Sequence, residues 1–210
     1  MKNYFYVFKN LKKGYLVMRI IAGKYRGFTL NTIPGKLIRP TPSKVREAIF
    51  DIIGFKVVDS DFLDLFAGTG AIGIEAISRG AKSVTFVERN RNAIELINTN
   101  LTKIGEKETA TIVKNDYIYS LKFLNEQQKK YDIIFLDPPY NKDLLQKTLS
   151  EIDRSSLLKN NSIIIAQYQI HEKMQNNFSR IQTIKEKRYG KTKVTIFSYN
   201  KQFKKGENND

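Results

Sequence analysis

Four consecutive residues, Asp137-Pro138-Pro139-Tyr140, follow the apolar segment YDIIFLD at 131–137, which is typical of a buried β-strand. The two prolines fix the backbone and remove two N–H donors, so the turn offers acceptors: the Asp137 carboxylate and free carbonyl groups. Such acceptors suit the amino group of a nucleic-acid base, because holding its hydrogens aims the nitrogen lone pair at an incoming methyl group. Tyr140 offers a ring for stacking on a base that is flipped out of its helix. The tetrapeptide therefore predicts amino-group methylation, although a rigid turn with a capping aspartate is the plainer interpretation.

A glycine-rich loop lies in the segment DLFAGTGAIG at 64–73. Gly68, Gly70 and Gly73 fit the pattern G-x-G-x-x-G between a predicted strand and a predicted helix. Glu88 ends the next predicted strand, where a carboxylate can accept from two ribose hydroxyls. The loop therefore predicts a nucleotide-like cofactor, either a dinucleotide or S-adenosylmethionine.

Asp64 distinguishes these two cofactors. A dinucleotide places a pyrophosphate at the helix N-terminus, where a neighbouring carboxylate would repel it. S-adenosylmethionine instead carries a sulfonium and an ammonium group, and Asp64 could offset their positive charge. Asp116 ends the segment VKND and could accept from the adenine amino group, but a solvated loop aspartate fits its position nearly as well. Asp64 therefore favours S-adenosylmethionine, and an NAD-dependent dehydrogenase remains the distant alternative.

Strand-like and helix-like segments alternate along the middle of the chain. The periodicity of apolar residues predicts strands at 61–66, 82–88, 109–114, 131–137 and 161–167, with amphipathic helices after Pro42, at 71–79, after Asn90, at 117–124 and at 144–152. The segment 180–199 predicts an antiparallel hairpin around Gly190. The expected fold is α/β, with a seven-stranded, mostly parallel sheet whose ligands lie at the carboxyl ends of the strands.

Residues 18–42 predict a small N-terminal β-hairpin that precedes the main domain at 43–200. Its basic residues alternate with apolar and aromatic ones, which fits either a surface for RNA contact or a solvated hairpin over the core. Thr41 is expected to cap the following helix, with Pro42 as its first residue. Residues 1–17 and 201–210 are expected to be a disordered extension and a disordered tail.

The composition limits the chemistry and the partners. Lys and Arg number 36 against 21 Asp and Glu, and the net charge of +15 favours a polyanionic partner, although part of it reflects a generally Lys-rich chain. The absence of cysteine excludes thiolate zinc sites and cysteine nucleophiles, and the single histidine excludes a His-rich metal site. No apolar run is long enough to cross a bilayer. We expect a cytoplasmic, metal-free monomer.

The motifs together resemble known methyltransferases. The combination of [DNS]-P-P-[YFW] with an acidic glycine loop is similar to enzymes that methylate DNA adenine, rRNA guanine or protein glutamine. The segments RIIAGKYRGFTL, IRPTPSKVREAIFDII, FLDLFAGTGAIGIEAISRGAKSVTFVERN and YDIIFLDPPY resemble more narrowly the bacterial RsmD-like 16S rRNA guanine-N2 methyltransferases, over residues 18–199. This resemblance implies a Rossmann-like class I methyltransferase, with S-adenosylmethionine as cofactor and 16S rRNA or a small-subunit assembly particle as partner.

The resemblance also implies roles for individual residues. Residues expected at the cofactor are Thr41, Asp64, Phe66, Gly68, Gly70, Glu88, Arg89 and Asp116. Catalysis is expected of Asp137, Pro138, Pro139 and Tyr140, and a place near the cofactor or the RNA of Arg39 and Arg46. The basic pattern of the hairpin itself predicts RNA contact by Arg19, Lys24, Arg26 and Arg39. A DNA adenine-N6 methyltransferase is the nearest alternative, although the chain leaves little room for a domain that reads DNA sequence. A protein-glutamine methyltransferase more often has Asn at the position of Asp137, and a simple RNA-binding module needs neither motif.

Overall fold

The computed structural model describes residues 18–32, 41–139, 143–172, 174–175 and 177–200. The predictions for residues 1–17 and 201–210, and those for Arg39 and Tyr140, lie outside these ranges.

Seven strands form one sheet, in the order β5-β4-β3-β6-β7-β9-β8. The strands are β3 (Asp61–Asp64), β4 (Ser83–Val87), β5 (Ala110–Val113), β6 (Tyr131–Leu136), β7 (Leu158–Gln169), β8 (Ile181–Tyr189) and β9 (Thr192–Tyr199). β3 to β7 are parallel, whereas β9 runs antiparallel to both of its neighbours. The predicted fold class, with its C-terminal antiparallel hairpin, is therefore confirmed.

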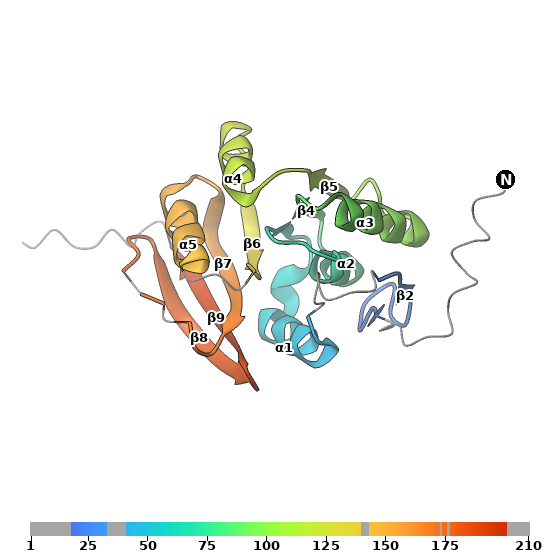
Figure 1. Ribbon diagram of the computed structural model, residues 1–210, viewed down its shortest axis with the longest axis horizontal. Coiled ribbons are helices and arrows are strands. Elements are labelled where there is room, and N and C mark those ends of the chain that lie inside the picture. The colour runs from blue at the N-terminus through green and yellow to red at the C-terminus, as the bar shows by residue number, and fades with distance from the viewer. Residues whose placement is uncertain (1–17, 33–40, 140–142, 173, 176, 201–210) are drawn as a thin grey trace, which may run out of the picture.

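Helices cover both faces of the sheet (Figure 1). One core lies under α1 (Ser43–Ile53), α2 (Ala71–Ser78) and α3 (Arg91–Ile104), and a second lies under α4 (Tyr117–Glu126) and α5 (Leu144–Arg154). Alternate residues of the five parallel strands and of β9 face one core or the other, as the period of two requires. A short 3-10 helix, η1 (Gly54–Val57), follows α1. In the described part of the chain, no helix is long and apolar enough to cross a membrane.

Of the two predicted helix caps, Asn90 is observed and Thr41 is not. The Asn90 side chain accepts from the Ala93 N–H at 3.1 Å and caps α3 as expected. α1 begins one residue later than predicted, with Pro42 at the cap position and no side-chain cap. The hydroxyl of Thr41 points instead to Asp137, at 3.4 Å from Oδ2. The predicted Thr41 cap is therefore wrong, because its hydroxyl is used at the end of β6.

The N-terminal hairpin is present in a short form, with β1 (Met18–Arg19) antiparallel to β2 (Thr29–Leu30). The buried Glu75 carboxylate on α2 accepts from the N–H groups of Ile21 and Ala22 at 2.8 and 3.0 Å. Gly23 has φ +84°, and a Cβ at this position would lie 1.8 Å from the Ser78 carbonyl oxygen. The backbone of the hairpin therefore packs directly onto α2.

Candidate active site

Asp137 lies at the carboxyl end of β6 and is held from two sides. Its Oδ2 accepts from Gln167 Nε2 at 2.9 Å and from the Thr41 hydroxyl at 3.4 Å. The register explains the first contact, because Leu136 pairs with Ala166 and the next residues of both strands lie level. The carboxylate orientation is thus fixed by β7 and by the residue before α1. Pro138 is buried and Pro139 is exposed, so the rigid turn reaches the surface directly after the carboxylate.

Asp64, at the end of β3, is 1% exposed and accepts from the Gly73 N–H at 3.1 Å. Burial raises the pKa of the Asp64 carboxyl to about 7, and the negative charges of Asp137 and Glu88 add to the rise, while the Gly73 hydrogen bond opposes it. The three carboxylates therefore share one region of negative potential at the carboxyl edge of the sheet. Such a region favours a cationic ligand and disfavours a pyrophosphate.

The three glycines of the loop have different physical roles. Gly68 and Gly70 have φ of +53° and +76°, which a residue with a side chain rarely adopts. Gly70 is the N-cap of α2. Gly73 lies inside the helix, and a Cβ there would lie 2.2 Å from Cε1 of Phe86 on β4. The third glycine is therefore required by the close packing of α2 on the sheet, as in dinucleotide-binding folds.

Glu88 is held by the backbone. Oε2 accepts from the Gly68 N–H at 2.8 Å, and Oε1 accepts from the N–H groups of Arg89 and Asn90 at 2.8 and 2.7 Å. A carboxylate can accept about four hydrogen bonds, and three of these positions are occupied by the backbone. About one acceptor position remains for a ligand hydroxyl, whereas the sequence suggested hydrogen bonds to two ribose hydroxyls.

Asp116 caps α4, because its Oδ1 accepts from the Ile118 N–H at 3.1 Å. Its Oδ2 lies 3.3 Å from Nη1 of the exposed Arg89. The Phe66 ring packs against Tyr117 with centroids 5.4 Å apart. The structure thus brings Phe66, Arg89 and Asp116 to the edge where β3, β4 and β5 end. It also shows that Asp116 caps a helix, a role that was not expected from the sequence.

The basic residues predicted to contact RNA divide into two groups. Arg19 and Arg26 are exposed on the hairpin, and Lys24, which is 70% exposed, lies 3.0 Å from Glu106 Oε1. Arg46 is only 1% exposed. Its Nη2 donates to the Arg19 carbonyl oxygen, and its Nε lies 3.6 Å from Glu75 Oε2. The structure corrects the prediction for Arg46, because this guanidinium is paired with a buried carboxylate under the hairpin and does not reach an RNA at the surface.

Gln167 is a site residue that the sequence analysis missed. It is 5% exposed, and beyond its bond to Asp137 its Oε1 is buried without a hydrogen-bond partner among the described residues. Its position as a polar residue directly after the run SIIIA was visible in the sequence. Its proximity to Asp137 depends on the pairing of β6 with β7, which no local pattern shows. Within the described ranges, no group of three or more His, Asp or Glu side chains is placed to hold a metal ion.

Known proteins resemble this chain over most of its length. A family model described as "Conserved hypothetical protein 95" matches residues 18–198. The Bacillus subtilis (strain 168) protein named "Putative rRNA methyltransferase YlbH" is 34% identical over 180 residues, which are 86% of this chain and 98% of that protein. The "Ribosomal RNA small subunit methyltransferase D" of Buchnera aphidicola subsp. Baizongia pistaciae is 38% identical over 148 residues, 70% of this chain and 74% of its own.

Solved structures give the same result. The structure described as "Putative methyltransferase yhhF from Escherichia coli" matches with a TM-score of 0.79 and 27% identity, over 89% of this chain and 99% of that one. The family model covers far more than half of the sequence, and so does the relative from Bacillus subtilis. The chain therefore belongs to the Conserved hypothetical protein 95 family, the RsmD-like family of ribosomal RNA methyltransferases.

Proposed function

We propose that this protein transfers a methyl group from S-adenosylmethionine to the exocyclic N2 amino group of a guanine in 16S rRNA, free or within a small-subunit assembly particle. The observation that carries the proposal is the Asp137 carboxylate, fixed by Thr41 and Gln167 near the carboxylates of Asp64 and Glu88. The names of the relatives support ribosomal RNA of the small subunit as the substrate.

The acidic residues at the carboxyl edge of the sheet fit S-adenosylmethionine better than a dinucleotide. Asp64 is a buried carboxyl with no cationic side chain among the causes of its pKa shift, and both of its charged neighbours are also acids. A sulfonium or ammonium group would stabilise these charges, whereas a pyrophosphate would add to their repulsion. Asp64, Gly68, Gly70 and Glu88 would hold the cofactor, with Thr41, Phe66, Arg89 and Asp116 around it. When bound, S-adenosylmethionine supplies an electrophilic methyl group.

The protein's own contribution is to position the acceptor nitrogen. The Asp137 carboxylate would accept hydrogen bonds from the guanine amino group, which directs the nitrogen lone pair toward the methyl donor. The same carboxylate can receive the proton that the nitrogen releases after methylation. Tyr140 is proposed to stack on the base. No covalent enzyme intermediate is needed, because the amino nitrogen itself is the nucleophile. We further propose a monomeric enzyme that acts in the cytoplasm without a metal ion.

Methylation of DNA adenine at N6 is the second candidate, because the same carboxylate and cofactor pocket would serve it. Outside the sheet and its helices, the described chain has only the hairpin at 18–30, which is a small surface for reading a DNA sequence. Separation of the methylated nucleosides by mass spectrometry distinguishes N2-methylguanosine, formed in RNA, from N6-methyl-2′-deoxyadenosine, formed in DNA.

The test is the Asp137→Ala variant, assayed by tritium transfer from labelled S-adenosylmethionine to small-subunit RNA and particles. We expect transfer to fall by about 100-fold or more, as for other preorganised transition-state contacts. Asp51→Ala removes an exposed carboxylate from α1 and serves as the control, for which we expect wild-type transfer. Undiminished transfer in Asp137→Ala would contradict the role assigned to this residue.

A further inference from the structure

The strand β8 is the outer strand of the sheet beside β9, and it carries several cations. Its residues from Gln182 to Arg188 are all exposed. Lysines on an edge strand often serve only to prevent pairing with another sheet. That role does not depend on which face of the strand the lysines occupy, so the distribution of charge between the two faces is informative.

A register shift sets the two faces of β8. The pairing with β9 shifts between Thr183 and Lys185, and Ile184 is the additional residue. After this point Lys185 lies opposite Ile196, and Lys187 lies opposite Val194. Directly opposed residues of antiparallel strands share a face, and both of these partners belong to the core under α1, α2 and α3. Lys185 and Lys187 therefore project from the same face of the sheet as the residues beneath α1.

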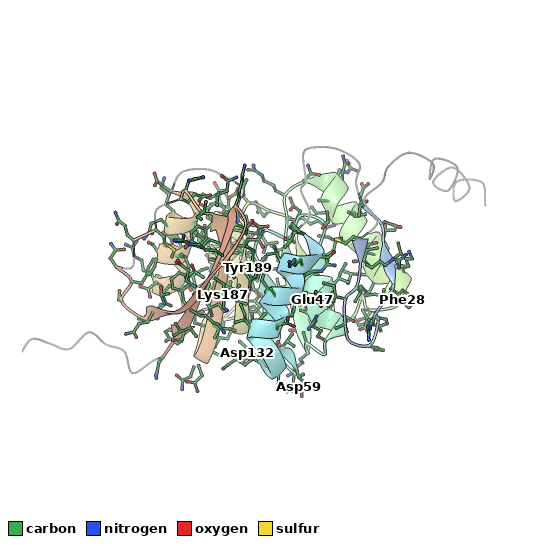
Figure 2. The ribbon with its side chains drawn as sticks, turned by 90° about the horizontal axis from the view of Figure 1, so that it is seen from below. Phe28, Glu47, Asp59, Asp132, Lys187 and Tyr189 are labelled. Atoms are coloured by element: carbon green, nitrogen blue, oxygen red, sulfur yellow. The ribbon has the colours of Figure 1, made fainter. Side chains whose placement is uncertain are left out.

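The same row of the sheet contains the candidate catalytic residue. Gln167 pairs with Val194, and Val194 pairs with Lys187, while Asp137 follows β6 level with Gln167. Lys187 is thus three strands away from Asp137, or about 14 Å at a strand spacing of about 4.8 Å. Figure 2 shows Lys187 and Tyr189 beside α1, the helix that starts next to Asp137. Tyr189 packs against the core of this face and holds the end of the strand there.

The charges on the two faces are balanced differently. On the face of α4 and α5, Glu186 Oε1 pairs with Lys193 Nζ at 3.0 Å. On the face of α1, the neighbouring residues of β7 and β9 are Ile165, Gln167, Val194 and Ile196, none of which is acidic. Within the described part of the chain, neither Lys185 nor Lys187 forms an ion pair with a carboxylate. This face of β8 therefore presents two cations in line with the active site that form no ion pair within the described ranges.

We propose that Lys185 and Lys187 bind the phosphate backbone of the substrate RNA next to the nucleotide that enters the site of Asp137. RNA is the partner because its phosphates supply the missing negative charge, and because the row places the lysines within a short distance of the methylated base. The inference rests on the proposed function, since it takes the occupant of the Asp137 site to be an RNA base. It adds a second RNA-contacting surface to the basic residues of the N-terminal hairpin.

The experiment compares the double variant K185Q/K187Q with K129Q/K130Q, which removes the same charge from exposed residues before β6, at the amino edge of the sheet. R188Q is the control on β8 itself, because Arg188 lies opposite Lys193 on the other face. The measurements are the Kd for a small-subunit RNA fragment at several salt concentrations, KM and kcat for methylation, and the Kd for S-adenosylhomocysteine.

For K185Q/K187Q we expect several-fold weaker RNA binding and a higher KM, with an unchanged Kd for S-adenosylhomocysteine. The slope of log Kd against log salt should decrease by about 1.4, because each single-strand phosphate contact contributes about 0.7. Both control variants should keep the wild-type slope. Equal slopes for K185Q/K187Q and the wild type would overturn the inference, as would an equal loss in R188Q. If the wild-type protein itself methylates no RNA, the proposed function fails instead.

Discussion

Three carboxylates meet at the carboxyl edge of the sheet, and each is held by a different kind of donor. Side chains hold Asp137, three backbone N–H groups hold Glu88, and burial with a single backbone N–H surrounds Asp64. The raised pKa of the Asp64 carboxyl follows from this difference, because it is the most buried and receives one hydrogen bond. A proton is therefore taken up or released at Asp64 near neutral pH.

Binding of a cationic ligand should depend on the protonation of Asp64. Below a pH of about 7 the Asp64 carboxyl of the ligand-free protein is protonated. Because a cationic ligand binds the ionised carboxylate, its affinity should decrease by up to about tenfold per pH unit as the pH falls below 7. Calorimetric titration with S-adenosylhomocysteine between about pH 5.5 and 8.5 measures this dependence. In Asp64→Asn we expect weaker binding that no longer changes across this range, and NAD should not bind the wild-type protein.

The same pKa also affects the ligand-free fold. The folded state binds the Asp64 proton more tightly than the unfolded chain, so its contribution to the free energy of unfolding decreases as the pH rises from about 4 to about 7.

For the binding experiment, an affinity for S-adenosylhomocysteine that rises equally with pH in Asp64→Asn would show that another group is responsible.

Gln167 is expected to act as a positioning residue for Asp137. Gln167→Met removes the donor to Asp137 Oδ2, and we expect kcat to fall about tenfold, as for the loss of a hydrogen bond to a charged group, with little change in KM for RNA. Stability should not decrease, because the change also removes a buried oxygen that has no partner among the described residues. Steady-state kinetics and urea unfolding measure the two effects.

Two further variants separate positioning from packing. Gln169→Met, two residues later on the same face of β7, should leave kcat unchanged. Gln167→Glu places a second carboxylate beside Asp137, which should raise the pKa of Asp137 and move the acid limb of the pH–rate profile to higher pH. A lower unfolding free energy together with an unchanged pH profile would instead indicate that Gln167 only fills space.

At the scale of elements, one buried carboxylate of α2 joins the hairpin to the helix. Glu75 accepts from the backbone of Ile21 and Ala22 and from Arg79 Nε at 2.8 Å, and it is the anion beside the buried Arg46. Glu75→Gln would leave the Arg46 charge buried without its partner. We expect the free energy of unfolding to fall by about 3–5 kcal/mol, the usual cost of breaking a buried pair.

Limited proteolysis and urea unfolding test this dependence. Cleavage within residues 18–30 should become faster in Glu75→Gln. Lys24→Gln is the control, because Lys24 lies on the same hairpin and is 70% exposed where it pairs with Glu106, and such exposed pairs contribute little to stability. An equal effect of the two variants would mean that Glu75 has no special role in docking the hairpin.

At the scale of the whole molecule, local patterns predicted the succession of strands and helices along the chain, because the spacing of apolar residues that marks each element lies within that element. The same locality explains what was missed. The site contact of Gln167, the interior position of Arg46 and the register shift beside Ile184 all depend on which distant segments pair. Arg46 illustrates the limit most clearly, since the family resemblance suggested contact with the RNA and only the buried Glu75 explains its place.

The strand order has a consequence for synthesis on the ribosome. β8 precedes β9 in the chain but pairs only with β9, which itself lies between β7 and β8. Because a chain emerges from its N-terminus onward, β8 has no partner until residues 192–199 have been made. The five parallel strands can assemble before that moment. The edge that carries Lys185 and Lys187 is therefore the last part of the sheet to form.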